Sequence, residues 1–530
     1  METLNKPNNL DPNIIIILLD QASNPFHWEN EHVKQFRAKN MKTMEFIRNN
    51  SVNLNNHHIA SSACVPSRAT LFTGLTSKKT NVHETDGVAK TPYELKWLDP
   101  SNTPTLGNIA INSGKYNLED VVYIGKHHLK ETLLLDEDSM RVETIDKTGK
   151  IIEQNLKIYR DNNMLSDLGF TWLSGVDPHG MSELNAGYLV DPGYVDIAID
   201  WLKTREKSNK KNPFIMTLSL VEPHDLVYFP TVWRMWGKKI PFNKKIDIDN
   251  IPVSPTDNED LSQYPMVYQN WVKRYDKYFT KQDPKFYRQF YYYLLTLADD
   301  NLSVFMDYFI NSVYTDNTVI VFTSDHGDSC GTHCNGYQKW YTPFEEVTNV
   351  FCNIMKFENG VSKWKYEINY PTSHIDIVPT ICTLLNIEYD NFDGSNIFSN
   401  DKKSKNIKCF IQDHITMGNN LTRFPFRIFP QLLSEKGIEA NFIPVDRNDN
   451  NKNVYPEYAQ SIIWKSINDM LYKLIIYHDP SNYDYHEIEY LINNKLILVY
   501  NLTNDKCETK NIVENDLEIT NYLYMELKYN

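Results

Sequence analysis

The fold is indicated by residues 14–21, which read IIIILLDQ and place an acid and an amide directly after six apolar residues. Comparable runs follow at 121–124, 214–220 and 318–323. Each is short, rich in β-branched or aromatic residues and bounded by polar ones, as is typical of strands buried on both faces of a parallel sheet. Asp325 follows the last run as Asp20 follows the first. Because open α/β sheets bind ligands beyond the carboxyl ends of their strands, these two acids are candidate site residues.

Helical patterns separate these strands. Thr103 with Pro104 predicts the start of one helix. Asp191 followed by Pro192 predicts the start of a second, and a third is expected over residues 286–309. This alternation predicts an α/β fold, with a large mixed, mostly parallel sheet sandwiched by helices.

The chain divides into two predicted domains. Residues 231–285 interrupt the α/β pattern with an aromatic and lysine-rich insertion, which we expect to form a loop excursion near the site. A polar linker follows at 400–406. Beyond it, short runs predict antiparallel strands at 461–464, 472–477 and 495–500. We therefore expect a catalytic domain over 1–405, and over 406–530 a smaller C-terminal α+β domain with a small antiparallel sheet.

Composition excludes several classes of protein. Of the 530 residues 41 % are hydrophobic and 23 % charged, which is unlike a disordered or fibrous chain. The net charge of −14 disfavours nucleic acid and anionic membranes as partners. Seven scattered cysteines argue against a disulfide framework. The longest apolar run is too short to span a bilayer and the N-terminus lacks a secretory signal, so we expect a cytoplasmic protein. Nothing in the sequence predicts an oligomeric state.

The strongest local signal is the segment 64–74, CVPSRATLFTG. A cysteine before a helix start is most often a small buried hydrophobe, and in some proteins a thiolate activated by the helix N-terminus. Arg68, one helical turn after Cys64, would place a cation beside it. The surroundings lack the signature of a papain-like nucleophile. The segment resembles the sulfatase signature Cys-x-Pro-Ser-Arg, whose cysteine is oxidised after synthesis to formylglycine.

Further segments resemble sulfatase motifs in the same order and spacing. They are IIIILLDQ at 14–21, GKHHL at 125–129, EPHD at 222–225, TSDHGD at 323–328 with Lys339 beyond it, and SHIDIVPT at 373–380. Any one of these would be weak evidence, but six ordered segments are specific. Over about residues 13–400 the chain is thereby identified as a member of the formylglycine-dependent sulfatase family, with its alkaline-phosphatase-like fold.

The resemblance implies a divalent metal bound by Asp20, Gln21, Asp325 and His326 together with residue 64. Oxygen donors with one imidazole suit Ca²⁺, Mg²⁺ or Mn²⁺. Ca²⁺ is the expected ion, and Mn²⁺ or Mg²⁺ is credible because neutral Gln21 stands where most sulfatases have a second Asp. Singly, Asp20 or Asp325 would be interpreted as a turn or capping acid. Jointly, at two strand ends, they favour metal binding.

The family also implies how residue 64 acts. One hydroxyl of hydrated formylglycine would attack sulfur, and the other would later expel the sulfate. Arg68 would lie against the nucleophile and the metal ligands. Without the cysteine motif, Arg68 would be interpreted as a surface arginine on a helix.

Four further residues receive roles from the resemblance. Lys126 and Lys339 would bind sulfate oxygens, His128 would orient the nucleophile, and His224 would protonate the leaving oxygen. Lys126 and His128 alternate by two, so on an extended segment both would point to the site while His127 packs away from it.

Gln21 and His326 are both familiar from the branch that contains choline sulfatases and phosphonate monoester hydrolases. We expect metal-dependent hydrolysis of a sulfate ester, small-molecule or glycan, after a maturation enzyme has converted Cys64. Two alternatives remain open: a phosphonate or phosphate (di)ester hydrolase on the same fold, and a catalytically silent binding protein that keeps the fold. The pair Lys126 and His128 favours sulfate.

Overall fold

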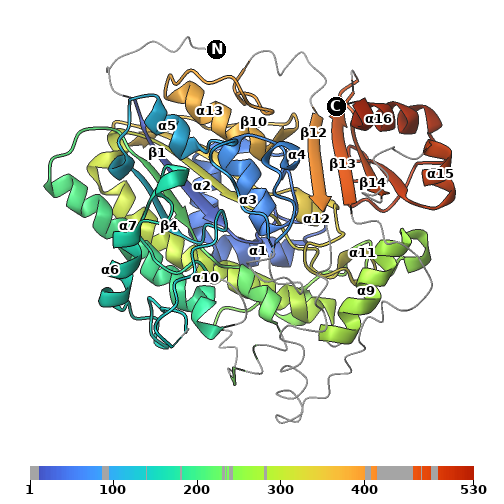
Figure 1. The fold of residues 1–530 in the computed structure, drawn as a ribbon. Helices are drawn as coiled ribbons and strands as arrows, with labels where there is room; N and C mark the ends of the chain where they lie inside the picture. The colour runs from blue at the N-terminus through green and yellow to red at the C-terminus, as the bar shows by residue number, and fades with distance from the viewer. Residues whose placement is uncertain are drawn as a thin grey trace.

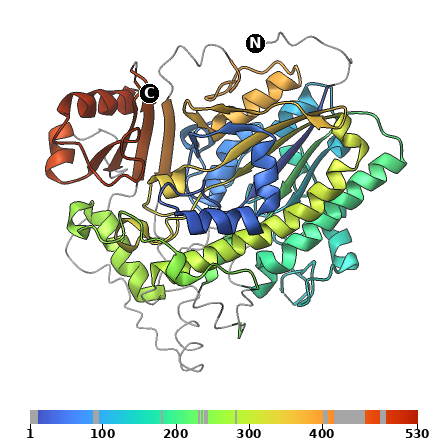
Figure 2. The ribbon, with the colours of Figure 1, turned by 180° about the vertical axis from the view of Figure 1, so that it is seen from behind.

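The computed structural model of the protein describes residues 11–85, 95–138, 140–178, 182–229, 233, 236–237, 243–279, 283–399, 408–414, 458–466, 468–478 and 487–529. They form a large central sheet between two layers of helices, with a small second sheet at one side (Figure 1; Figure 2). Among these residues, no helix is both long enough and apolar enough to cross a membrane.

The central sheet has nine strands in the order β10-β2-β8-β7-β1-β6-β4-β5, with β9 paired to β8. Their bounds are β1 Asn13–Leu19, β2 Val52–Leu54, β4 Val121–Gly125, β5 Thr171–Trp172, β6 Ile215–Ser219, β7 Asn317–Ser324, β8 Cys352–Glu358, β9 Val361–Ser362 and β10 Tyr366–Ile368. The four runs predicted as strands are confirmed as β1, β4, β6 and β7, which are adjacent and parallel. β8 runs antiparallel to β7 and β2, so the sheet is mixed, as expected. A separate pair is formed by β3 (His57–His58) and β11 (Thr372–Ser373).

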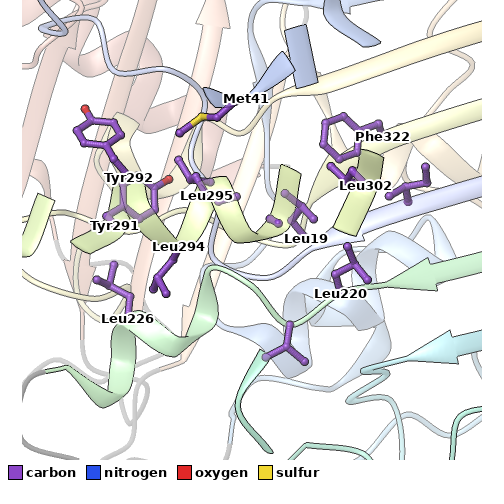
Figure 3. Packing of buried hydrophobic residues seen from close by; sticks show 14 of the residues in the cluster. Leu19, Met41, Leu220, Leu226, Tyr291, Tyr292, Leu294, Leu295, Leu302 and Phe322 are labelled. Carbon is purple, nitrogen blue, oxygen red and sulfur yellow. The ribbon is translucent and has the colours of Figure 1, made fainter. Parts of the chain in front are cut away.

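Side chains of β1 alternate between two cores, because successive residues of a strand point to opposite faces. Ile15, Ile17 and Leu19 belong to one core, and Ile14 and Ile16 to the other. The helices over the first core are α1 Glu31–Asn40, α2 Lys42–Asn49, α7 Gly187–Lys207 and α10 Pro284–Ile310. Those over the second are α3 Cys64–Thr73, α5 Leu106–Asn112 and α13 Ile377–Leu384. Figure 3 shows α10 packing across the strand ends in the first core.

The long helix predicted over 286–309 is present as α10. The helix start predicted at Thr103 is wrong: α5 begins at Leu106, and the side chain of Thr105 accepts hydrogen bonds from its first turn. Thr103 instead donates its hydroxyl to the carbonyl of Asp99. Both threonines are good capping residues, and the turn before the helix, which local sequence did not indicate, selects between them.

The helix start predicted at Asp191 and Pro192 is also wrong, because α7 already begins at Gly187. Asp225 accepts the backbone N–H groups of Gly187 and Tyr188 at 2.9 and 3.4 Å and so caps the helix. Asp191 in turn accepts two backbone N–H groups from the loop that carries Asp225. The cap thus comes from a segment distant in sequence.

The second sheet has four antiparallel strands in the order β12-β13-β14-β15 (Figure 1). Its strands are β12 Lys408–His414, β13 Tyr458–Lys465, β14 Leu471–His478 and β15 Ile497–Asn501, with α15 Ile488–Asn493 and α16 Leu517–Tyr529 packed on it. The three runs predicted as antiparallel strands are confirmed as β13, β14 and β15. The predicted linker 400–406 lies outside the described residues, and the domain boundary stays a prediction.

The insertion predicted as a loop excursion over 231–285 is partly helical. Its residues Met266–Phe279 form α9, and most of 230–242 lies outside the described residues. Trp233 and Trp271 are both buried and contribute to the core. The remaining α-helices of the described part are α4 Ser77–Thr80, α6 Glu153–Asn162, α11 Thr332–Asn335 and α12 Glu345–Thr348.

Candidate active site

Two neighbouring parallel strands carry the acids of the site. β1 and β7 pair with Leu19 opposite Ser324, so Asp20 and Asp325 occupy the next position at each strand end. The backbone N–H of Gln21 donates to Asp325 Oδ1 at 3.0 Å and ties the two strand ends together. Both carboxylates are fully buried. The site thus forms where the carboxyl ends of adjacent strands meet.

Cys64 is the first residue of α3, and its thiol lies among these side chains. Its Sγ lies 3.2 Å from His326 Nε2, 3.1 Å from Lys339 Nζ and 3.8 Å from Asp20 Oδ1. Ligand atoms of Asp20, Cys64, Asp325 and His326 all lie within 4.8 Å of one another. Burial, together with the Asp20 carboxylate, raises the pKa of the Cys64 thiol to about 11. Unmodified cysteine is therefore a protonated thiol at neutral pH.

Arg68 contacts both acids at once from within α3. Its Nη2 donates to Asp20 Oδ2 at 3.0 Å and its Nε to Asp325 Oδ2 at 2.9 Å. Its Nη1 donates to the backbone carbonyl of Lys126 and to Ser219 Oγ. Because the guanidinium is planar and rigid, it holds the two carboxylates at a fixed separation.

Two buried lysines reach the site from other elements. Lys126 follows β4 directly, and its Nζ lies 2.7 Å from Asp20 Oδ2. Lys339 donates from Nζ to Gln21 Oε1 at 2.9 Å as well as to the thiol. Burial would raise the pKa of Asp20, but the charge of Lys126 and of further neighbouring cations outweighs it, so the pKa lies well below its usual range.

The segment after β4 is not extended as predicted. His128 adopts a left-handed conformation with φ of 46°. Its backbone N–H and that of His127 donate to the carboxylate of Asp177 at 3.0 and 2.8 Å. His128 Nε2 lies 3.1 Å from the carbonyl oxygen of Pro178, and His127 packs edge-on against Trp172. The alternation argument therefore fails at His128, because Asp177 turns the chain there.

His224 approaches the site from the loop after β6. It opens the 3-10 turn His224–Tyr228, and its Nδ1 is buried without a hydrogen-bond partner among the described residues. Burial lowers the pKa of the imidazole well below its usual value, and the charges of Lys126, Lys339 and His128 lower it further. A buried ring nitrogen without a partner is costly in the free protein and is available to a bound ligand.

The donor set at the strand ends fits a divalent cation. His326 Nδ1 lies 2.9 Å from the carbonyl oxygen of Gly327, which assigns the proton to Nδ1 and leaves Nε2 as a lone pair facing the thiol. Burial lowers the pKa of His326 to about 4, so the ring is neutral, as ligation requires. Asp20 and Asp325 offer carboxylate oxygens, and Gln21 an amide oxygen. This set suits Ca²⁺, Mg²⁺ or Mn²⁺.

Several supporting residues were not predicted. Ser67 donates its hydroxyl to the backbone carbonyl of Asp325, and Asp328 accepts a hydrogen bond from Gln21 Nε2 at 2.6 Å. Both lie within the motifs quoted above, so the motifs could have indicated that Ser67 and Asp328 belong to the site. Asp177, which shapes the His128 turn, lies outside every motif and had no signal in the sequence.

A second buried group of charges joins the first part of the chain to the C-terminal sheet. Lys473 Nζ of β14 lies 3.1 Å from Glu345 Oε1 and 3.0 Å from Glu508 Oε1. His333 Nε2 lies 3.3 Å from Glu346 Oε2. We call these five residues the Lys473 cluster. His333, Glu346 and Glu508 also bring ligand atoms within 4.8 Å of one another, and within the cluster Glu346 contacts His333 while Glu508 contacts Lys473.

Known proteins resemble this chain in sequence and in fold. Residues 12–387 match the family model described as Sulfatase. The chain is 21% identical over 396 residues to the uncharacterized sulfatase YidJ of Escherichia coli, which covers 71% of this chain and 68% of the relative. It is 22% identical over 385 residues to the choline-sulfatase of Rhizobium meliloti, which covers 72% and 68%. The solved structure of the phosphonate monoester hydrolase SpPMH from Silicibacter pomeroyi shares the fold, with a TM-score of 0.59 at 14% identity over 97% of this chain and 93% of that one.

Proposed function

The chain belongs to the sulfatase family and is a sulfuric ester hydrolase, and from that premise we propose that residue 64, converted from cysteine to formylglycine, is its nucleophile. The observation that carries the proposal is the position of Cys64 Sγ, 3.1 Å from Lys339 Nζ and 3.2 Å from His326 Nε2, where two strand ends meet. A protonated thiol with a pKa of about 11 is a poor nucleophile there. The hydrated aldehyde would place two hydroxyls at the same position.

We assign the two stages of hydrolysis to these two hydroxyls. One hydroxyl oxygen forms a bond to sulfur while the bond between sulfur and the ester oxygen breaks, and the alcohol leaves with a proton. The second hydroxyl then loses its proton, the aldehyde re-forms, and the bond between its carbon and the sulfate oxygen breaks. Water adds to the aldehyde and restores the diol. Each cycle consumes one water and releases the alcohol and hydrogen sulfate.

The residues at the strand ends would hold the divalent cation, with Ca²⁺ the first candidate and Mn²⁺ or Mg²⁺ the next; they are Asp20, Gln21, Asp325 and His326, together with residue 64. A bound cation would gather negative charge at the reacting centre. Arg68 supports this assignment because it already holds both acids at a fixed separation, so the donor set is preorganised.

The balance of charge supports an anionic substrate. Arg68, Lys126 and Lys339 contact the carboxylates of Asp20 and Asp325 or the thiol, and a third buried carboxylate, that of Asp328, lies behind Gln21. Lys126 and Lys339 would contact sulfate oxygens. Cations gathered at a buried site attract anions and disfavour neutral esters.

We assign protonation of the leaving oxygen to His224. Orientation of the nucleophile by His128 rests on the family resemblance alone, because His128 Nε2 faces the carbonyl oxygen of Pro178. Burial and the charge of Lys126 depress the pKa of His224 in the free protein. The negative charge of an approaching sulfate would favour its protonated form, and an imidazolium with a depressed pKa gives up its proton readily. His224 Nδ1 is buried and has no hydrogen-bond partner in the part of the chain that the structure describes, which supports a role toward the substrate.

Mass spectrometry of the intact protein, followed by mapping of the peptide that carries residue 64, tests the nucleophile. The full-length protein is produced with a formylglycine-generating enzyme, and Cys64→Ala serves as the matched control. We expect the aldehyde at residue 64 and hydrolysis of an aryl sulfate in the first preparation, and neither in the second. An unmodified Cys64 that binds sulfate esters without turnover would support the silent binding protein instead.

One observation favours a second candidate, a phosphonate or phosphodiester hydrolase: Gln21 and His326 at the strand ends, a combination familiar from the branch that contains phosphonate monoester hydrolases and also choline sulfatases. A sulfate monoester and a phosphodiester each carry one negative charge, so charge does not separate them. The pair Lys126 and His128 tips the choice toward sulfate. The matured protein should hydrolyse an aryl sulfate faster than an aryl phosphonate or phosphodiester with the same leaving group, and the reverse order would establish the second candidate.

A further inference from the structure

Behind the Gln21 side chain lies a closed ring of hydrogen bonds. Gln21 Nε2 donates to Asp328 Oδ2 at 2.6 Å and to Gln338 Oε1 at 3.2 Å. Gln338 Nε2 donates to the Tyr287 hydroxyl at 3.0 Å, and that hydroxyl donates to Asp328 Oδ2 at 3.1 Å. None of the four side chains is more than 1 % exposed. The ring joins α10 to the loops that follow β1 and β7.

The directions of these hydrogen bonds follow from Asp328. Its Oδ1 accepts the backbone N–H of Cys330 at 2.7 Å, and its Oδ2 accepts from Gln21 and Tyr287. Both carboxylate oxygens of Asp328 accept, so the groups that face them donate. Both amide hydrogens of Gln21 are thereby used inside the ring. Its Oε1 is left on the opposite side, where Lys339 Nζ donates to it at 2.9 Å.

If the side-chain amide of Gln21 were turned so that its oxygen and nitrogen exchanged places, both ends would face an unfavourable neighbour. Its NH₂ group would face the ammonium of Lys339, which is also a donor, and its oxygen would face the carboxylate of Asp328, which is also an acceptor. An amide has two unlike ends of nearly equal shape, so its neighbours decide which end faces Lys339. Here both neighbours select the same orientation.

We propose that Asp328, supported by Tyr287, is a positioning residue that fixes the Gln21 amide with its oxygen toward Lys339 and the candidate metal ligands. Asp328 acts through Gln21 and not by touching the reacting atoms. The role of that oxygen as a ligand rests on the proposed function, whereas the orientation of the amide does not. Without Asp328, Gln21 would present a donor to the cation site in part of the molecules.

The test exchanges the polarity of the Gln21–Asp328 pair. In Asp328→Asn the new amide keeps its oxygen on the N–H of Cys330 and presents its NH₂ to Gln21, which then flips. We expect the affinity for Ca²⁺, measured by calorimetry on metal-stripped full-length protein, to fall about 10- to 100-fold. Gln21→Glu alone sets two carboxylates face to face and should also bind more weakly. The double variant again pairs a donor with an acceptor and should return to within about threefold of wild type.

Two further variants serve as controls. Asp299→Asn changes a buried carboxylate of α10 that accepts two backbone N–H groups away from the ring, and it should leave Ca²⁺ affinity unchanged. Tyr287→Phe removes one donor to Asp328 and should weaken binding in the same direction by a smaller factor. If Asp328→Asn does not fold, the Ca²⁺ affinity of Tyr287→Phe tests the positioning role of Asp328.

Two outcomes would overturn the inference. One is an Asp328→Asn variant that binds Ca²⁺ like wild type, and the other is a double variant as weak as either single variant, which would reveal a merely structural role. A wild-type protein that binds no Ca²⁺, Mg²⁺ or Mn²⁺ would refute the metal assignment in the proposed function. The inference is then decided by a neutron crystal structure of Asp328→Asn, which distinguishes amide oxygen from nitrogen, and an unchanged contact between Gln21 Oε1 and Lys339 Nζ would contradict it.

Discussion

The Cys64 site and the Lys473 cluster are both buried groups of charges, and their balance of charge differs. At the Cys64 site three permanent cations stand against two carboxylates; they are Arg68, Lys126 and Lys339 against Asp20 and Asp325. His224 adds a buried ring nitrogen that has no partner among the described residues. This region therefore has capacity for an anion that the chain itself does not supply.

In the Lys473 cluster the acids outnumber the permanent cation, and each contacts a basic side chain. Glu345 and Glu508 contact Lys473, and Glu346 contacts His333. Burial would raise the pKa of Glu345, but His58 and Lys473 outweigh it and hold the pKa well below its usual range. Burial would lower the pKa of His333, but the hydrogen bond to Glu346 raises it. The cluster therefore joins two parts of the chain and needs no ligand.

The difference shows that buried charge alone does not identify an active site. The informative difference is that the Cys64 site combines converging cations with a histidine nitrogen that meets no partner among the described residues, whereas each acid of the Lys473 cluster contacts a basic side chain. A cluster that is complete within the chain contributes to stability instead. Substitutions in the two regions should therefore separate activity from stability.

The largest effect is expected from Cys64→Ala in the matured protein. Loss of the nucleophile should lower kcat for an aryl sulfate by a factor on the order of 10⁴ or more, since removal of a nucleophile eliminates the covalent route. The thiol pairs with no opposite charge of its own, so the melting temperature should stay close to that of wild type. Steady-state kinetics and thermal denaturation check both parts. Undiminished activity would show that another group is the nucleophile.

A smaller effect on activity is expected from His224→Asn. With an alkyl sulfate, whose leaving oxygen needs a proton, kcat should fall about 10²- to 10⁴-fold. With a nitrophenyl sulfate, whose leaving group departs without protonation, the loss should be much smaller. The quantity to measure is the loss of kcat with the alkyl sulfate divided by the loss of kcat with the nitrophenyl sulfate. Equal losses for both substrates would mean that His224 binds or positions the substrate and does not protonate it.

Lys473→Met should affect stability far more than activity. It leaves the buried carboxylates of Glu345 and Glu508 without their cation, which should cost about 3–5 kcal/mol of unfolding free energy. Lys465→Met is the matched control, because Lys465 pairs with the exposed Asp469 and should cost less than about 1 kcal/mol. Urea denaturation measures both. Equal stabilities of the two variants would contradict the structural role of the Lys473 cluster.

The smallest effect is the contribution of Glu345 to stability against acid. Its pKa is lower in the folded protein than in the unfolded chain, so it stabilises the fold above its ordinary pKa, and this stabilisation is lost as the pH falls through the folded value. Unfolding free energies from about pH 6 to pH 3 should therefore drop more steeply for wild type than for Glu345→Gln. Parallel curves would show that Glu345 is not held ionised by its neighbours.

Much of the fold could be predicted because its determinants are local. A strand buried on both faces is a continuous apolar run, and the residues 14–19 have no other reading in a chain of alternating strands and helices. The meeting of Asp20 with Asp325 then follows from the parallel arrangement, and the place of Arg68 follows from its helical spacing to Cys64. Local pattern and global topology agree at these positions.

The parts that could not be predicted are set by contacts between distant segments. Asp177 turns the backbone at His128, and no feature of the intervening sequence announces this contact. Asp225 caps α7 from another loop, which moves the helix start away from the local signal at Asp191. The direction of the Gln21 amide likewise depends on a residue more than half the chain away.

The burial of α3 limits the time during which Cys64 can be oxidised. All ten residues of the helix are buried, and Cys64 is 3% exposed. The thiol is enclosed by His326 and Lys339, which leave the ribosome long after it does. An enzyme that oxidised Cys64, as we propose, would therefore have to act before β7 pairs with β1. Oxidation and folding would then compete as rates, and a substitution that speeds folding would lower the fraction of chains that mature.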